Sequence, residues 1–246
     1  MVIPLKANRI TKYFGDEQVL DELNLQLHPR ETLSILGRSG CGKTTLLKIL
    51  GGLESPDGGN VLINGTNVRK LRPQERDIVY LYQEALLFPH LNVFENIAFG
   101  LRLRKFSDDV IASHTNQMIE RLGLAGMAQK MPHQLSGGQQ QRVSFGRALI
   151  TNPSVLLLDE PFGSLDADTR HSMQQFFTDI ADEFDITAIF VTHNVKEAML
   201  MGDRIGSLSN GKLSIFDSVD AFINSDNSIV QDEISFWESI QNRKSN

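Results

Sequence analysis

The residues with the clearest capacity for chemistry are Gly37–Thr44, which read Gly-Arg-Ser-Gly-Cys-Gly-Lys-Thr. Their spacing matches G-x-x-x-x-G-K-[ST], the pattern of a loop that binds phosphate groups. Glycines let the backbone N–H groups of such a loop turn inward, the lysine adds positive charge, and the hydroxyl can bind Mg²⁺. We therefore expect this loop and the residue that follows it to bind a nucleotide. These residues are Gly37, Arg38, Ser39, Gly40, Cys41, Gly42, Lys43, Thr44 and Thr45.

The elements around the loop agree with this interpretation. An apolar strand pattern, Thr32–Leu36, precedes it, and a helical pattern with Leu46, Leu47 and Leu50 on one face follows it. A helix that starts near Lys43 would present its free N–H groups and the positive end of its dipole to an anion.

Polar residues follow two further apolar strand patterns. Val155–Leu158 ends in Asp159 and Glu160, and a second buried run, residues 188–191, is followed by Thr192 and His193. Ligands of open parallel sheets bind outside the carboxyl ends of the strands. Asp159 fits a carboxylate that holds Mg²⁺ near phosphates, and Glu160 could face an attacking water. Without the phosphate loop, Glu160 would be read as an ordinary solvated strand end.

The remaining patterns predict an α/β chain with a helical segment. Strands are expected at 5–14, 22–28, 61–63 and 78–82, and the strict alternation over 23–27 indicates a sheet with one wetter face. From about Asn92 to Ile150 the patterns are helical, with Asn92, Ser107 and Ser136 as candidate caps. An amphipathic helix should run through 173–184, a hairpin should turn at Asn210-Gly211, and the tail carries a weaker helical stripe of Val230, Ile234, Trp237 and Ile240.

Composition limits the classes of protein that remain. The chain has 246 residues, a net charge of −6 and one cysteine, Cys41, so an internal disulfide is excluded. An acidic balance argues weakly against a nucleic-acid surface, and no nucleic-acid partner is expected. The N-terminus shows no signal-peptide pattern, and no run approaches the ~20 apolar residues of a membrane span. Action at a membrane would need a partner that carries the spanning helices.

One further stretch makes the interpretation specific. Leu135–Arg142, which reads Leu-Ser-Gly-Gly-Gln-Gln-Gln-Arg, resembles the signature motif of ATP-binding cassette (ABC) ATPases. The chain from Lys6 to about Phe216 resembles such a cassette motif by motif and in the family's order. Gly37–Thr44 corresponds to the Walker A loop and Val155–Glu160 to the Walker B strand. Gln83 corresponds to the Q-loop, Ser164–Asp166 to the D-loop and His193 to the switch histidine. Tyr13, with Val19 nearby, corresponds to the aromatic residue that stacks on adenine.

The resemblance implies an ATPase that works as a head-to-tail dimer of two copies with two ATP molecules between them. Glu160 would orient or deprotonate the attacking water, and His193 would contact the γ-phosphate and bridge to Asp166 of the second copy. Mg²⁺ would be held by Thr44, Gln83 and Asp159. The signature residues that would reach the ATP of the other copy are Ser136, Gly137, Gly138 and Gln139.

For the fold, the residues and the resemblance together predict a P-loop NTPase (RecA-like) α/β core with a parallel sheet. An antiparallel β-subdomain at the N-terminus and an inserted all-helical subdomain are expected as well. We expect one ABC ATPase domain over residues 1–246, with residues 1–88 and 151–246 as the catalytic core and residues 89–150 as the helical subdomain.

The absence of a spanning pattern indicates a separate subunit, peripheral on the cytoplasmic face of the cell membrane. Residues 85–97 are similar to importer cassettes of the polyamine, ferric-iron and sugar group, in which a groove near Gln83–Phe99 would dock an integral membrane permease. Many of these cassettes carry a C-terminal regulatory β-domain, and with the sequence ending at Asn246 we expect none here. The permease and a binding protein would select the substrate.

Two alternatives remain at this point: a soluble ABC ATPase that acts on DNA or ribosomes, and a regulatory cassette that does not hydrolyse ATP. Only about fifty residues separate Gln83 from Leu135, which is too few for the long coiled coil of chromosome-type members. Translation-type members carry two cassettes, whereas this chain has one. A regulatory cassette is disfavoured by four intact residues: Lys43, Asp159, Glu160 and His193.

Overall fold

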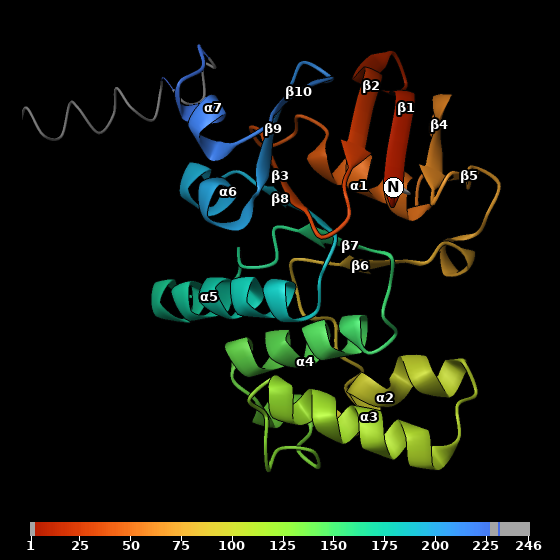
Figure 1. Ribbon diagram of the computed structural model, residues 1–246, viewed down its shortest axis with the longest axis vertical. Helices are drawn as coiled ribbons and strands as arrows, with labels where there is room; N and C mark the ends of the chain where they lie inside the picture. Colours follow the sequence, from red (N-terminus) through yellow and green to blue (C-terminus); the bar gives the residue numbers. More distant parts are fainter. Residues whose placement is uncertain (1–2, 227–230, 232–246) are drawn as a thin grey trace, which may run out of the picture. The chain divides into compact units, whose positions relative to one another are not determined.

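The structure is a computed structural model that describes residues 3–226 and residue 231 (Figure 1). It divides into two compact units. The first combines the described parts of Met1–Arg76 and Asp185–Asn246, and the second is Asp77–Phe184. The helical stripe expected at Val230, Ile234, Trp237 and Ile240 lies outside the described residues.

The first unit begins with an antiparallel sheet of strand order β2-β1-β4-β5 (Figure 1). Side chains of β2 alternate between buried and more exposed positions over 23–27, which confirms the two-faced sheet. Leu5 of β1 lies between Leu27 and Ile63 of its two neighbours, so the apolar side chains of three strands share one face. The strands are β1 (Leu5–Phe14), β2 (Glu17–Leu27), β4 (Gly58–Ile63) and β5 (Thr66–Asn67).

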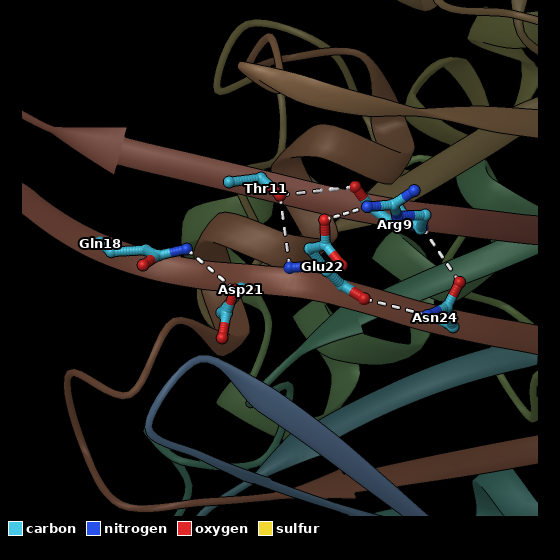
Figure 2. Close-up of polar contacts among 6 residues, drawn as sticks. All are labelled: Arg9, Thr11, Gln18, Asp21, Glu22 and Asn24. Atoms are coloured by element: carbon cyan, nitrogen blue, oxygen red, sulfur yellow. Dashed lines mark hydrogen bonds and ion pairs between the residues drawn. The ribbon is translucent and has the colours of Figure 1, made fainter.

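The β1–β2 ladder is interrupted in its middle. Arg9 and Glu22 both have left-handed backbones, with φ of 48° and 43°, and the register shifts between Ala7 and Ile10. Figure 2 shows how polar side chains replace ladder bonds there: the Arg9 N–H donates to Asn24 Oδ1 at 3.0 Å, and the Glu22 N–H donates to the Thr11 hydroxyl at 3.3 Å. A bulge of this kind bends the strand and increases its twist.

The second sheet of the first unit has the order β10-β9-β3-β8. Strand β3 is parallel to both neighbours, with Leu36 opposite Thr192 of β8 and Ser207 of β9. Leu36 packs with Ala198, Ile205 and Phe222 in a buried cluster. The elements are β3 (Thr32–Leu36), α1 (Lys43–Gly51), β8 (Ala188–Thr192), α6 (Val195–Met201), β9 (Arg204–Ser209), β10 (Lys212–Phe216) and α7 (Val219–Ile223).

The second unit holds two parallel strands and the main helical segment. Strands β6 (Ile78–Leu81) and β7 (Val155–Asp159) pair in parallel, with Leu81 opposite Leu158. Phe145 lies 5.6 Å from Phe177, ring centre to ring centre, which joins the last two helices of the unit. The helices are α2 (Val93–Leu103), α3 (Asp108–Arg121), α4 (Gly137–Leu149) and α5 (Ala167–Glu183), with a short 3₁₀ turn at Pro132–Gln134.

The helix starts follow the expected caps, with one correction. The side chains of Asn92 and Ser136 accept from the N–H groups three residues ahead, as capping side chains do. Ser107 does precede α3, but its side chain makes no capping hydrogen bond. Two acidic residues in the first turn, Asp108 and Asp109, complement the helix dipole instead.

The α/β class, the antiparallel N-terminal sheet and the helical segment are confirmed. Some bounds differ from those expected. Strand β2 starts at Glu17 rather than Glu22, because hydrogen bonds to β1 extend it through an exposed polar stretch. The helical segment 89–150 lies within the second unit, which is larger because it also contains β6, β7 and α5.

Candidate nucleotide site

The phosphate loop connects β3 to α1 in the first unit. Lys43 is buried, and its ammonium group donates to the carbonyl oxygens of Gly37 at 2.8 Å and Arg38 at 3.2 Å. Arg38, Ser39, Gly40 and Thr44 are exposed around it. The loop therefore curls over its own lysine and leaves its tip and the first turn of α1 accessible, which is the arrangement that a bound phosphate needs.

Two glycines make this curl possible. Gly40 and Gly42 have φ of 82° and 105°, in the left-handed region that favours glycine. A Cβ atom on Gly42 would also lie 3.0 Å from Val19 Cγ1 and 3.1 Å from Leu20 Cδ2. Replacement of Gly42 would thus strain the backbone and crowd the neighbouring strand.

A pocket of about 520 Å³ opens beside the loop. The β9–β10 hairpin closes one side of it, and this hairpin is tied to β2 by a hydrogen bond from the Asp21 N–H to Gly211 O at 2.9 Å. The volume lies in the range of small-molecule sites. The lining residues are Glu17, Gln18, Val19, Arg38, Ser39, Gly40, Cys41, Leu208, Ser209, Asn210 and Gly211.

Tyr13 and Val19 belong to the same unit. Tyr13 is 43% exposed near the end of β1 and lies opposite Gln18, which lines the pocket. Val19 lines the pocket directly and contacts the loop at Gly42. An exposed aromatic ring one strand away from a phosphate loop has the amphipathic character suited to stacking on a base.

His193 follows β8, the strand beside β3. Because Leu36 and Thr192 are opposite each other, the phosphate loop and His193 leave the same edge of the parallel sheet. His193 is exposed, and its two chain neighbours are hydrogen-bonded: the Thr192 hydroxyl donates to the buried Glu197 carboxylate at 2.7 Å and accepts from the Asn194 N–H at 3.0 Å. This network fixes the backbone on both sides of the histidine.

In the second unit, Asp159 ends β7 and Glu160 follows it. The Tyr80 hydroxyl, which comes from the neighbouring strand β6, donates to Asp159 Oδ2 at 2.6 Å. Burial, together with this hydrogen bond to a carboxylate, raises the pKa of Tyr80 far above its usual range. Glu160 is half-buried and has a left-handed backbone with φ of 46°, a conformation that costs energy in a residue other than glycine.

Gln83 lies just beyond β6 and is exposed. A Cβ atom on Gly163 would lie 2.8 Å from Gln83 Nε2, so Gln83 and the segment that follows Glu160 are close together. Asp166 caps α5 by accepting from the Thr169 N–H at 3.0 Å, and this hydrogen bond holds the pKa of Asp166 below its usual range. Gln83, Glu160 and Asp166 thus come from one cluster of loops in the second unit.

The signature residues form the start of α4. Ser136 and Gln139 make a reciprocal capping box, in which the Gln139 N–H donates to Ser136 Oγ at 3.3 Å and the Ser136 N–H donates to Gln139 Oε1 at 3.0 Å. Ser136 and Gly137 are exposed, whereas Gly138 is buried because Thr169 of α5 lies where its Cβ would be. A γ-phosphate could approach the two exposed residues.

The donor groups suit a hard cation. Thr44, Gln83 and Asp159 offer a hydroxyl, an amide oxygen and a carboxylate, and Mg²⁺ prefers such oxygen ligands together with several waters. The described residues contain no group of three or more His, Cys, Asp or Glu side chains that could hold a metal ion alone.

Sequence reasoning missed Tyr80 and the hairpin residues at the pocket. Tyr80 is an apparently apolar strand residue, and only the register that sets it opposite Leu157 brings its hydroxyl to Asp159. The available signal was a tyrosine, whose ring carries a polar hydroxyl, in a strand that is otherwise apolar. Asn210 and Gly211 were identified as a turn, but they are more than 160 residues from Cys41 in the chain.

In the part of the chain that the structure describes, we find no helix with the length and apolar character of a membrane span.

Comparison with known proteins agrees with these features. Residues 20–163 match the family model described as ABC transporter. The spermidine/putrescine import ATP-binding protein PotA of Acetivibrio thermocellus is 42% identical over 209 residues, which are 85% of this chain and 59% of the relative. The sulfate/thiosulfate import ATP-binding protein CysA of Pectobacterium atrosepticum is 41% identical over 211 residues, 84% of this chain and 64% of the relative.

Among solved structures, cbiO1 of Clostridium perfringens, part of the ABC transporter complex cbiONQ, superposes with a TM-score of 0.83 at 25% identity. The match covers 91% of this chain and 92% of that one. The chain spans only about 60% of the length of the curated relatives, 59% and 64% in the two cases above. Because the family model matches more than half of the chain, this protein belongs to the ABC transporter family.

Proposed function

We propose that this chain is the ATP-hydrolysing subunit of a membrane transporter, most similar to subunits that power import. The observation that carries the proposal is the phosphate loop, where Lys43 is enclosed by a glycine-rich turn at the start of α1. The import ATP-binding proteins PotA and CysA, which align over more than four fifths of this chain, support the importer class.

In the proposed mechanism, each residue has a task that its position supports. The loop N–H groups and Lys43 hold the β- and γ-phosphates, while Tyr13 stacks on the base beside Val19. Mg²⁺, held by Thr44, Gln83 and Asp159, would neutralise charge on the phosphates. Glu160 orients or deprotonates the attacking water, and its left-handed backbone, with φ of 46°, sets it apart from the strand that precedes it. His193 contacts the γ-phosphate.

We further propose that two copies close head to tail. Ser136 and Gly137 are exposed at the N-terminus of α4, a helix of 13 residues, and would present N–H groups and a hydroxyl to the γ-phosphate bound by the other copy. Asp166 would meet the partner near its His193. In this arrangement each of the two ATP sites is formed by residues of both copies, so ATP hydrolysis requires the two copies to associate.

The permease partner is proposed to bind the groove near Gln83–Phe99, together with Tyr82 beside it. Leu86 is 53% exposed and Tyr82 39%, and the ring centres of Phe88 and Phe99 lie 4.5 Å apart with their planes tilted by 42°. The guanidinium of Arg147 lies over Phe88 and donates to Leu86 O at 3.1 Å, which holds this segment on α4. An apolar, rigid surface next to Gln83 would transmit nucleotide binding to a membrane subunit at the cytoplasmic face.

The cargo is proposed to be selected by other subunits. PotA is named for polycations and CysA for anions, yet the two relatives are 42% and 41% identical to this chain. A cassette that is equally similar to both carries little information on the charge of the transported molecule.

The proposal is tested by ATP binding and phosphate release with purified wild type, Lys43→Ala and Lys48→Ala. Lys48 is an exposed lysine on the same helix and serves as the matched control. We expect Lys43→Ala to weaken ATP binding by about 100-fold, or roughly 2.7 kcal/mol, because the triphosphate loses its buried cation. Lys48→Ala should bind like wild type. Equal binding by all three proteins would refute the assignment.

A further inference from the structure

A cluster of charged residues links the turn after α1 to the strand end that carries Tyr13. Lys12 is 8% exposed, and its ammonium donates to Glu54 Oε1 at 2.8 Å and to Ser55 O at 2.9 Å. Its ammonium also lies 3.9 Å from Asp57 Oδ1. The hydrogen bond from Lys12 holds the pKa of Glu54 below its usual range.

Asp57 contacts the Tyr13 backbone directly. Asp57 Oδ2 accepts from the Tyr13 N–H at 2.6 Å, and the Asp57 N–H donates to Thr11 O at 2.9 Å. These two bonds bracket Lys12 on β1. The turn therefore binds the end of β1 at Thr11 and Tyr13 through the backbone, and at Lys12, between them, through charged side chains.

This turn is also hydrogen-bonded to α1, the helix that follows the phosphate loop. The N–H groups of Leu53 and Glu54 donate to Lys48 O of α1 at 2.8 and 3.2 Å. Asp57 therefore stands between two elements: the helix whose first turn binds phosphates and the strand whose exposed ring would meet the base. The ladder to β2 shifts register between Lys12 and Tyr13, so β2 alone gives Tyr13 an irregular support.

We propose that Asp57 is a positioning residue for base recognition, and that the Lys12–Glu54–Asp57 cluster sets the position of the Tyr13 ring relative to the phosphate loop. The inference rests on the proposed nucleotide function of Tyr13. A displaced ring loses stacking on the base but leaves the triphosphate contacts intact. Loss of Asp57 should therefore lower the affinity for ATP and spare the affinity for inorganic tripolyphosphate.

The experiment measures the affinities of the full chain for ATP and for tripolyphosphate, and their ratio reports the contribution of the base and ribose. Base–aromatic stacking is worth about 1–3 kcal/mol, so Tyr13→Ala should lower this ratio about ten-fold. Asp57→Ala should lower it by about three- to ten-fold, since part of that stacking is lost. Asp57→Asn keeps an oxygen acceptor for the Tyr13 N–H, so its ratio should stay close to that of wild type.

Asn24→Ala is the matched control. Asn24 Oδ1 accepts from a β1 backbone N–H at 3.0 Å, that of Arg9, as Figure 2 shows. It thus makes the same kind of bond on the same strand, away from Tyr13, and its loss should leave the ratio unchanged. Should Asp57→Ala fail to fold, Asp57→Glu keeps the charge for Lys12 but moves the acceptor, and a lowered ratio is again expected.

A double variant separates positioning from general destabilisation. In a Tyr13→Ala background, Asp57→Ala should have no further effect on the ratio, because residues that act through one another are not additive. An unchanged ratio in Asp57→Ala and Asp57→Glu, with a lowered ratio in Tyr13→Ala, would overturn the inference alone. An unchanged ratio in Tyr13→Ala would instead overturn the proposed base site.

Discussion

At the scale of single residues, the second unit shows how a carboxylate is held in place. Asp159 ends a strand of four buried apolar residues, and the Tyr80 hydroxyl fixes one of its oxygens at 2.6 Å. A partner that orients a metal-binding side chain typically changes metal affinity by about 10–100-fold when it is removed. With Asp159 as the proposed Mg²⁺ ligand, loss of the Tyr80 hydroxyl is therefore expected to weaken Mg²⁺ binding.

Tyr80→Phe should raise the Mg²⁺ concentration needed for half-maximal ATP hydrolysis by about ten-fold, because Asp159 loses the donor that orients it. The measurement is a Mg²⁺ titration of phosphate release at saturating ATP. Tyr82→Phe is the matched control, since Tyr82 is exposed and lies two residues further along the same segment. The same Mg²⁺ dependence in Tyr80→Phe and wild type would contradict the orienting role.

At the scale of elements, one buried side chain shapes the loop before α2. Asn96 is fully buried, and its amide donates to the carbonyl oxygens of Phe88, Leu91 and Asn92 at 3.2, 2.7 and 3.0 Å. Its own oxygen accepts from the Phe88 N–H at 2.9 Å. The loop therefore takes its shape from the helix that follows it, and the proposed permease surface depends on this anchor.

Asn96→Ala should lower the free energy of unfolding by about 2–4 kcal/mol, because several buried backbone groups lose their partner. Urea denaturation gives this value. Glu95→Ala removes a half-exposed pair with Arg102 and should cost about 1 kcal/mol or less. ATP binding should be unchanged in both variants, because the phosphate loop lies in the other compact unit. Equal stability of the two variants would show that Asn96 is not the anchor.

At the scale of the whole molecule, the candidate residues divide between the two units. The phosphate loop, Tyr13 and His193 belong to the first, whereas Gln83, Asp159, Glu160 and the start of α4 belong to the second. ATP hydrolysis as proposed needs residues of both units and of a second copy. Association of two chains should therefore respond to ATP and to the loss of hydrolysis.

Glu160→Gln should bind ATP with wild-type affinity and lower turnover by at least about 100-fold, the contribution typical of a general base. The trapped ATP should convert the variant into a dimer, which sedimentation with and without Mg-ATP would detect. Glu120→Gln, an exposed position on α3, is the control and should behave like wild type.

Addition of Gly137→Asp to Glu160→Gln should abolish the dimer, because the new carboxylate would face the γ-phosphate of the second copy. Near wild-type turnover in Glu160→Gln would refute the role of Glu160. A dimer that persists with Gly137→Asp would refute the head-to-tail arrangement.

The sequence by itself determined the features that local interactions produce. Gly37–Thr44 between an apolar strand and an apolar-faced helix was sufficient for the phosphate loop, and Asn92 and Ser136 were sufficient for two helix starts. The Asn210-Gly211 turn predicted the β9–β10 hairpin in the same way. Caps, tight turns and left-handed glycines involve partners only a few residues apart, so their residue types carry the information.

Only the tertiary structure decided which distant residues meet. The Tyr80–Asp159 bond joins positions 79 residues apart, and the Asp57–Tyr13 bond joins positions 44 apart. The register of β6 against β7 creates the first contact, and the return of the chain from α1 to β1 creates the second. Neither follows from the hydrophobic period of a single segment, since pairing with a distant segment decides which residues are opposite each other. The division into two compact units, which places β6 and β7 with the helices, likewise depends on packing between segments far apart in the chain.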